Sequence, residues 1–416
     1  MSPAPPIVIV GAGAAGIMAA IFAAEARARV VLVERTRDGG RKILISGGGR
    51  CNVLPSVLDP SRFVTDSSPH TLRNILRSWP LEAQREFFEE TLGLGLTLEP
   101  ETGKLFPASN RARDVRDRLL AEAARRGVEI RFDALIEDVR PSGSGKGWEL
   151  VPAEASSFGA GAVILATGGL SVPATGSDGL GIRIARRLGH AIHDTYPALT
   201  PLVAEPPVHA MLAGVSLAVT LHATVAGRRV VTRGGFLFTH RGYSGPAVLD
   251  ISHVAARARQ MGVPQPILVQ WSARDARSWE TRLEQRSAGS VMTALKEELP
   301  ARLAERLLLE AGIPGVRTLS QLRRDERQAL IERLTRYPLP WTGDEGYRKA
   351  EVTGGGVALE EVDPRTMESR RHPGLFFCGE MLDAFGPIGG HNFAWAWVTG
   401  RAAGMGAGRL ASGPPA

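Results

Sequence analysis

The sequence predicts an α/β fold with a central parallel sheet, and three observations at the N-terminus lead to it. Ile7–Val10 is a short β-branched apolar run, typical of a strand buried on both faces. A Gly-x-Gly-x-x-Gly turn at 11–16 follows, and then an alanine-rich, helix-favouring stretch from Ile17 to Arg27. A second strand, Val30–Val33, ends at Glu34, so strand, turn, helix, strand and acid occur in the order of a Rossmann-like dinucleotide-binding unit.

Each glycine of this turn has its own expected role. Gly11 makes the tight turn, Gly13 lets the backbone approach a pyrophosphate, and Gly16 lets the helix pack closely on the strand. The free N–H groups and the positive dipole end of the helix attract the phosphates. Glu34 is expected to accept hydrogen bonds from an adenosine ribose.

Segment 39–52 extends the expected site from the phosphates towards a flavin. It combines two glycine clusters with the cations Arg41, Lys42 and Arg50. Such a loop can wrap a diphosphate and the edge of an isoalloxazine ring. A flexible, solvated loop is the alternative, but Ile43–Ile45 makes the segment too apolar for that.

Ordered motifs along nearly the whole chain resemble the YhiN/BaiN-type flavoproteins, also described as aminoacetone oxidase family FAD-binding enzymes. The resemblance rests on six blocks, at 11–16, 40–52, 166–179, 237–247, 352–357 and 374–397. It implies a Rossmann-like FAD-binding domain of the two-dinucleotide-binding flavoprotein type, with an inserted β-rich domain and a small helical domain. The expected domains are 1–194 with 346–416 for FAD, 195–278 with 337–345 for the β-rich insert, and 279–336 for the helices.

The resemblance also implies how the later segments complete the FAD site. The strand at 375–378 ends at Gly379-Glu380, where flavoproteins of this type place an acid against the ribityl hydroxyls. The turn at 386–392 opens a helix whose N–H groups can stabilise negative charge on the pyrimidine edge of reduced flavin. The main chain of Ile136 is expected to bind adenine. The complete set of expected cofactor-binding residues is Gly11, Gly13, Ala14, Ala15, Gly16, Glu34, Arg35, Gly40, Arg41, Lys42, Ser46, Gly47, Gly48, Cys51, Asn52, Ile136, Thr167, Gly168, Gly379, Glu380, Gly390, Asn392 and Phe393.

The insert is expected to consist of short strands at 216–225, 229–232, 235–238 and 266–271, followed by helices over 279–336. Segment 227–259 holds six arginines against one acid, and 109–131 holds seven arginines against four acids. These arginines either contact RNA phosphates or form solvated faces. Arg228, Arg229, Arg233 and Arg241 are the candidate RNA-binding residues.

Bulk composition restricts the class of protein. The chain has 416 residues, a net charge of +7 and two cysteines in unrelated contexts, Cys51 and Cys378. The cysteine count argues against a disulfide scaffold, a zinc site or an iron–sulfur cluster, so no metal is expected. No long apolar run and no basic leader occur, which favours a cytoplasmic protein without a membrane partner. The basic excess favours a polyanionic partner, although arginine-rich codon usage gives the same composition.

Members of the family have been associated with uridine reduction in large-subunit ribosomal RNA, steroid enone reduction and amine oxidation. The basic charge favours RNA, so reduction of uridine to dihydrouridine is the leading hypothesis. No second Gly-x-Gly-x-x-Gly follows a strand, so NADH or NADPH is expected to reduce the flavin transiently and leave. Reduction of an alkene requires a proton donor, for which Cys51 and His391 are the catalytic candidates. Cys51 could instead only pack, and His391 could instead contact cofactor backbone.

Two other classes of function remain open. A small-molecule amine oxidase or enone reductase would turn over free substrates and ignore RNA. A non-catalytic RNA-binding factor that contains FAD would bind RNA in a salt-sensitive way, and NADH or NADPH would not reduce its flavin. His240 and Tyr243 could contact a base or merely pack the insert.

Overall fold

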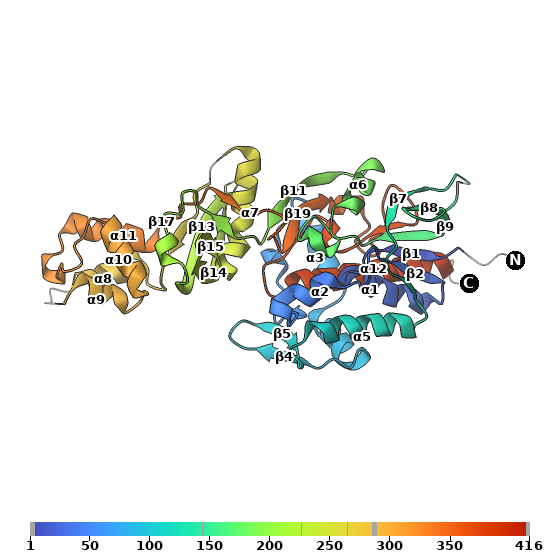
Figure 1. The fold of residues 1–416 in the computed structure, drawn as a ribbon, viewed down its shortest axis with the longest axis horizontal. Coiled ribbons are helices and arrows are strands. Elements are labelled where there is room, and N and C mark those ends of the chain that lie inside the picture. Colours follow the sequence, from blue (N-terminus) through green and yellow to red (C-terminus); the bar gives the residue numbers. More distant parts are fainter. Residues whose placement is uncertain (1–4, 144, 226, 264, 285–288, 413–416) are drawn as a thin grey trace. The chain divides into compact units, whose positions relative to one another are not determined.

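The computed structural model describes residues 5–143, 145–225, 227–263, 265–284 and 289–412 (Figure 1). The chain forms two compact units, one of Met1–Thr195 with Val352–Ala416 and the other of Tyr196–Glu351. The expected boundaries, including a separate helical domain at 279–336, stay a prediction.

The first unit is built on a five-stranded parallel sheet with the strand order β20-β10-β1-β2-β6. Its strands are β1 (Ile7–Val10), β2 (Val30–Val33), β6 (Glu129–Arg131), β10 (Ala162–Leu165) and β20 (Leu375–Phe377), and the first two have the expected bounds. Strand β1 is fully paired in register, with Ile7 opposite Val30 on one side and Ala162 on the other. The prediction of a Rossmann-like sheet is confirmed.

Two helices of the first unit, α1 (Ala14–Ala23) and α12 (His391–Ser412), pack along each other although they lie at opposite ends of the chain (Figure 1). The sequence predicted the first at 17–27 and the second after the turn at 386–392, so α1 starts earlier than expected and α12 begins within that turn. The other helices of this unit are α2 (Arg41–Ile45), α3 (Pro69–Arg77), α4 (Leu81–Glu86), α5 (Ala112–Arg125) and α6 (Leu180–Arg187).

Smaller sheets complete the first unit. One is the antiparallel set β7 (Ile136–Pro141), β8 (Trp148–Pro152) and β9 (Phe158–Ala160), and another is β3 (Leu54–Pro55), β5 (Lys104–Pro107) and β4 (Leu96–Glu99). The chain leaves and re-enters this unit through the paired strands β11 (Ile192–Ala198) and β19 (Val352–Val357).

The second unit contains a seven-stranded antiparallel sheet, with helices that share its hydrophobic core. In spatial order its strands are β17 (Tyr337–Pro338), β16 (Leu268–Gln270), β13 (Ser216–Val225), β14 (Arg228–Phe238), β15 (Gly242–Ser244), β12 (Leu202–Val203) and β18 (Gly343–Asp344). Its helices are α7 (Pro246–Met261), α8 (Ala276–Leu283), α9 (Val291–Lys296), α10 (Ala301–Glu310) and α11 (Arg324–Thr335).

Two expectations for the second unit were wrong. The separate strands expected at 229–232 and 235–238 form the single strand β14, because the backbone stays paired to β13 across Gly234. Helix α7 was not expected at all, although Pro246 at its first position is a favoured helix start.

Among the residues that the structure describes, no helix is both long and apolar enough to cross a membrane. The same residues contain no cluster of three or more metal-ligating side chains.

Candidate FAD site

The glycine turn after β1 closes tightly against its neighbours and opens at one point. An added Cβ would lie 1.8 Å from the Gly11 carbonyl oxygen at Gly16, and 2.6 Å from the Ala166 oxygen at Gly11. At Gly13, which precedes the first residue of α1, nothing lies within 4 Å of such an atom. The turn therefore leaves space only where the N–H groups of Ala14 and the following residues begin the helix.

Glu34 lies at the end of β2, beside this turn. Its Oε2 accepts a hydrogen bond from Ala12 N at 2.7 Å, and its Oε1 accepts from Thr36 N at 2.8 Å. Ala134 N donates to the Glu34 carbonyl at 2.9 Å, which places Ile136, the predicted adenine contact, two residues further along that chain. Oε1 also accepts from Thr36 Oγ1 at 2.8 Å, so Oε2 is the oxygen with a further lone pair available to a ribose hydroxyl.

Helices α1 and α12 are parallel and approach closely through glycine. Added Cβ atoms at Gly400 and Gly404 would each lie 2.3 Å from a backbone oxygen of α1, those of Ala15 and Ala19. These contacts pair the first residue of α1 with about residue 399, eight residues after the start of α12. At 1.5 Å per residue, the N-terminus of α12 extends about 12 Å beyond that of α1. Both N-termini face the same way, so two positive dipole ends lie at different heights along one direction.

The loop that follows β2 folds onto the glycine turn. Gly40 N donates to Ala12 O at 2.8 Å, and the next residues form the short helix α2. Gly47 and Gly48 have left-handed backbone, with φ of 55° and 66°, and Gly48 faces open space. Asn52 Oδ1 is buried and has no hydrogen-bond partner among the described residues, so this loop holds an orphaned acceptor.

The three cations of the loop are held by acids. Arg41 pairs with Asp38 at 2.8 Å, and Arg50 pairs with Glu99 at 3.1 Å while it lies over the ring of Phe106. Ser46 Oγ donates to Ile43 O at 2.8 Å and closes α2. Only Lys42 reaches across the site.

Lys42 and Glu380 form the centre of a polar cluster. Lys42 Nζ lies 2.5 Å from Glu380 Oε2, and the two side chains are 24% and 17% exposed. Ser171 Oγ donates to Glu380 Oε1 at 2.5 Å, and Thr353 donates to the same oxygen through N at 3.1 Å and Oγ1 at 3.0 Å. An added Cβ at Gly169 would clash with Thr353 and Glu380, so glycine is needed for the cluster to form.

Sequence reasoning identified Lys42 and Glu380 but missed Ser171 and Thr353. Both missed residues stand beside the glycines of motifs that the sequence does show, Gly168-Gly169 and Gly354-Gly355-Gly356. A short hydroxyl side chain next to a small-residue turn at a strand end is the signal that could have found them.

The turn before α12 is closed by its own asparagine. Asn392 Oδ1 accepts from Gly386 N at 2.8 Å, and its Nδ2 donates to Gly386 O at 2.9 Å. Gly390, with φ of 93°, packs on the backbone of Leu54. Phe393 stacks on Trp397, with ring centroids 5.4 Å apart. These contacts fix the position at which α12 begins.

The two candidate proton donors are both buried. Cys51 is fully buried in left-handed backbone, with φ of 65°, and burial raises its pKa to about 12 against the smaller opposing effect of Ser46. Burial, with a smaller contribution from the charge of Arg62, lowers the pKa of His391 to about 4. At neutral pH Cys51 therefore keeps its thiol proton and His391 is an uncharged imidazole.

The remaining predicted cofactor residues lie at the ends of β2, β10 and β20. Thr167 Oγ1 accepts a hydrogen bond from Gly181 N at 3.2 Å, at the start of α6. A Cβ added at Gly168 would lie 2.7 Å from Ser177 Oγ. Arg35 pairs with Asp178 at 2.5 Å. Gly379, with φ of 78°, packs on Ala15 of α1.

These residues fit FAD. The open position at Gly13 and the start of α1 suit a pyrophosphate, and Glu34 is placed for a ribose. The orphaned Asn52 acceptor, the open Gly48 and the advanced N-terminus of α12 suit a polar ring beyond it. Which residue contacts which atom of FAD stays a prediction.

The four arginines predicted to bind RNA lie in the second unit, in two different settings. Arg229 and Arg233 are exposed on β14, while the side chain of Arg228 lies outside the described part of the structure. Arg241 lies between Glu205 and Glu345, 3.9 Å from each. In the other arginine-rich segment, 109–131, most of the arginines pair with acids, namely Arg111, Arg116, Arg125, Arg126 and Arg131.

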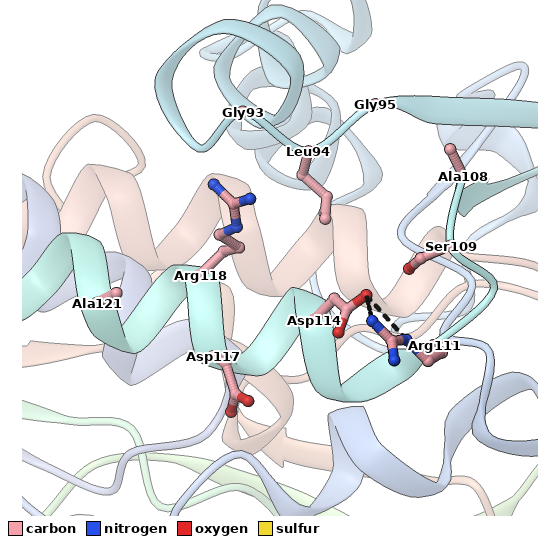
Figure 2. Close-up of a pocket in the computed structure, with 10 residues that line it drawn as sticks. All are labelled: Gly93, Leu94, Gly95, Ala108, Ser109, Arg111, Asp114, Asp117, Arg118 and Ala121. Carbon is pink, nitrogen blue, oxygen red and sulfur yellow. Dashed lines mark hydrogen bonds and ion pairs between the residues drawn. The ribbon is translucent and has the colours of Figure 1, made fainter.

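A hollow of about 520 Å³ lies against α5 and contains none of the predicted site residues (Figure 2). Arg111 is bound to Asp114 at 3.1 Å, and Arg118 donates to Leu92 O at 3.2 Å. The pKa of Asp114 is lowered chiefly by a hydrogen bond from Ser109. Asp117 is bound to Arg116. The charged side chains that line the hollow are thus paired with other groups of the protein.

Comparison with known proteins gives matches over almost the whole chain. Residues 5–406 match the family model described as HI0933-like protein Rossmann domain. The chain is 36% identical to the ribosomal RNA dihydrouridine synthase of Escherichia coli over 401 residues, 94% of each protein. It is 34% identical to the 3-dehydro-bile acid delta(4,6)-reductase of Clostridium scindens over 408 residues, 96% of this chain and 98% of that protein. In fold it is similar to 3-ketosteroid delta1-dehydrogenase from Sterolibacterium denitrificans, with a TM-score of 0.52, 12% identity and coverage of 97% and 99%.

Proposed function

We propose that this chain, which belongs to the HI0933-like family of FAD-dependent oxidoreductases, reduces uridine to dihydrouridine in large-subunit ribosomal RNA. The observation that carries the proposal is similarity over 94% of both chains to a protein with that activity in its name. The bile acid reductase, at 34% identity, is named for a related reaction. Both names describe saturation of a carbon–carbon double bond that is conjugated to a carbonyl group.

The reaction adds a hydride to one alkene carbon and a proton to the other. FAD, when bound, would supply the hydride, and NADH or NADPH would be the source of its electrons. The start of α12 offers backbone N–H groups that would stabilise negative charge on reduced flavin, and Asn392 holds that start in position. Glu380, held by Lys42, would accept hydrogen bonds from the ribityl hydroxyls of bound FAD.

Cys51 is the proposed proton donor. Its raised pKa keeps a proton on sulfur at neutral pH, and the proton passes to the alkene carbon that does not receive the hydride. His391 is uncharged at the same pH because burial lowers its pKa to about 4. We therefore assign His391 to shaping the turn at the flavin end and the proton to Cys51.

The test is anaerobic incubation of the purified protein with NADH or NADPH and unmodified large-subunit rRNA. Mass spectrometry of the nucleosides would then measure a gain of two hydrogens on uridine. The proposal predicts this gain. Normal flavin reduction by the nicotinamide without any gain on uridine would refute the RNA substrate.

A second candidate function is favoured by the similarity to the bile acid reductase. In this case the substrate is a free enone, RNA has no effect, and turnover depends little on salt. Incubating the same protein with a 3-keto-Δ4 steroid separates the two, because an RNA enzyme leaves the steroid unchanged. Absence of flavin reduction by either nicotinamide would instead indicate a non-catalytic factor.

A further inference from the structure

One face of the second unit's sheet is cationic and open. Side chains of β14 alternate, so Phe236 and Phe238 point into the core while Arg229, Val231 and Arg233 are exposed. Helix α7 packs on the inner face, where Thr232 Oγ1 donates to Ala247 O at 2.9 Å. We call the opposite face of β13, β14 and β16 the outer face.

The register of the three strands gathers polar groups around the two arginines. His222 on β13 lies opposite Val231 on one side and Leu268 of β16 on the other. Thr220 lies opposite Arg233 and also opposite Gln270. This pairing follows from the sheet topology, so the sequence alone does not place these groups together.

Three cations surround His222. Arg229 contacts its Nδ1 at 3.1 Å. Burial lowers the pKa of His222 most, and the charges of Arg229, Arg233 and Arg336 lower it further, against a hydrogen bond with Gln270. The contact with Arg229 places one guanidinium group directly against this ring.

The two exposed arginines of β14 have no acidic partner in the part of the chain that the structure describes. Among the described residues, neither Arg229 nor Arg233 forms an ion pair, whereas Arg241 lies between two glutamates and Arg259 is 2.9 Å from Asp344. Arg336 pairs only with exposed Glu332, at 3.2 Å. Like charges held on one face without counter-charges favour a polyanion, because binding releases its counterions.

The face also indicates how an RNA would be bound. Its exposed apolar residues are aliphatic, Val231 at 42% and Leu237 at 37% exposed, and it presents no Phe, Tyr or Trp for base stacking. Arginine, threonine and glutamine side chains instead suit phosphate and ribose oxygens.

We infer that the outer face binds the sugar–phosphate backbone of a structured RNA through Arg229 and Arg233. This inference rests on the proposed function for the identity of the polyanion. It assigns no role in RNA binding to Arg241, whose charge is already balanced by glutamates.

The test compares Arg229→Ala/Arg233→Ala with a control that removes the same charge from ion-paired sites, Arg111→Ala/Arg241→Ala. Binding of unmodified large-subunit rRNA is measured at salt concentrations from about 0.05 to about 0.3 M. Each phosphate contact contributes about 0.9 to the slope of log K against log salt concentration. Loss of two contacts therefore lowers this slope by about 2 and lowers the affinity about 60-fold at about 0.1 M salt. The control keeps wild-type binding, and Arg229→Lys/Arg233→Lys recovers most of it.

Flavin reduction by NADH or NADPH, which requires no RNA, checks that each variant is folded and active. Equal RNA affinity and salt slope for the outer-face variant and wild type would overturn the inference, as would absence of RNA binding by wild type. Loss of binding in the outer-face variant, with no dihydrouridine formed by wild type, supports the face and refutes the proposed reaction. Dihydrouridine formed equally by both proteins supports the reaction and refutes the face.

Discussion

Replacing Gly404 by alanine would put a methyl group into the closest contact between α1 and α12. The new Cβ would lie 2.3 Å from Ala19 O and 3.0 Å from Ala23 N, both backbone atoms of α1. Carbon contacts are favourable at about 3.5 Å, so the two helices must separate by about 1 Å. Because neither contact is a flexible side chain, only movement of a helix relieves the clash.

The expected effect is the difference between two opposing contributions. Overpacking a tight interior costs about 1–3 kcal/mol, while alanine in place of glycine inside a helix gains about 1 kcal/mol. Because the clash is with backbone atoms, we expect a cost in the upper part of this range, about 2–3 kcal/mol, and therefore a net destabilisation of the first unit by about 1–2 kcal/mol. Since α1 carries the phosphate-binding turn, FAD affinity should also fall, about tenfold for each 1.4 kcal/mol of strain that binding must restore.

Gly408→Ala provides a control in the same helix. Its added Cβ would lie 2.9 Å from the Ala26 methyl group and 3.4 Å from Ala23 O, a milder clash with the same gain in helix propensity. Thermal unfolding of the apoprotein and quenching of flavin fluorescence on binding measure the two effects. If Gly404→Ala were as stable as wild type and bound FAD equally well, the close approach of α1 and α12 would be refuted.

Three further predictions concern single side chains. Lys42→Met leaves Glu380 without its cation, so we expect the free energy of unfolding to fall by about 1–3 kcal/mol after allowance for partial exposure. A double-mutant cycle with Glu380→Gln, measured by denaturant unfolding, tests the pair, and a coupling energy near zero would contradict it. Cys51→Ala should lower uridine reduction by about 10²–10⁴ while flavin reduction by the nicotinamide stays normal, and turnover within threefold of wild type would make Cys51 a packing residue. Because its pKa is about 12, Cys51 should cause no change in rate between about pH 6 and 9. Burial alone would raise the pKa of Glu310, but contacts with His209 and other donors lower it to about 2. Its ionised form therefore stabilises the fold by about 3 kcal/mol above about pH 4.5. This stabilisation is lost as the pH falls through about 2. Denaturant unfolding should show Glu310→Gln to be less stable than wild type at pH 7 and the difference to shrink as the pH falls to about 2, and equal stability at pH 7 would contradict the assignment.

The parts of the fold that depend on neighbouring residues could be predicted from the sequence. Strands β1 and β2 have the expected bounds because apolar β-branched runs and a glycine turn act locally. Helix α7 could also have been found, since Pro246 and an apolar pattern mark its start, but the β-rich reading of the insert obscured it. The two short strands expected around Gly234 failed because pairing to β13 outweighs the weak strand preference of glycine.

The polar cluster of the FAD site depends on contacts between distant segments. Lys42 and Glu380 are 338 residues apart, and Ser171 joins them from the loop after β10 while Thr353 joins them from β19. No local pattern specifies that four such residues meet. The sequence predicted that the strand ends of one sheet carry the site, but the order of the strands decides which side chains touch.

The arginine-rich segments show why counting charges does not identify a surface for a polyanion. Segment 109–131 has the larger number of arginines, yet its arginines mostly pair with acids on or near α5. The outer face has fewer cations, but strand alternation points Arg229 and Arg233 the same way, and the pairing of β13 with β16 brings no acid beside them. A polyanion responds to uncompensated charge, so the local period of a strand and the non-local register of its sheet together decide where it binds. Substituting Arg229 and Arg233 should therefore weaken RNA binding far more than removing the same charge from Arg111 and Arg241.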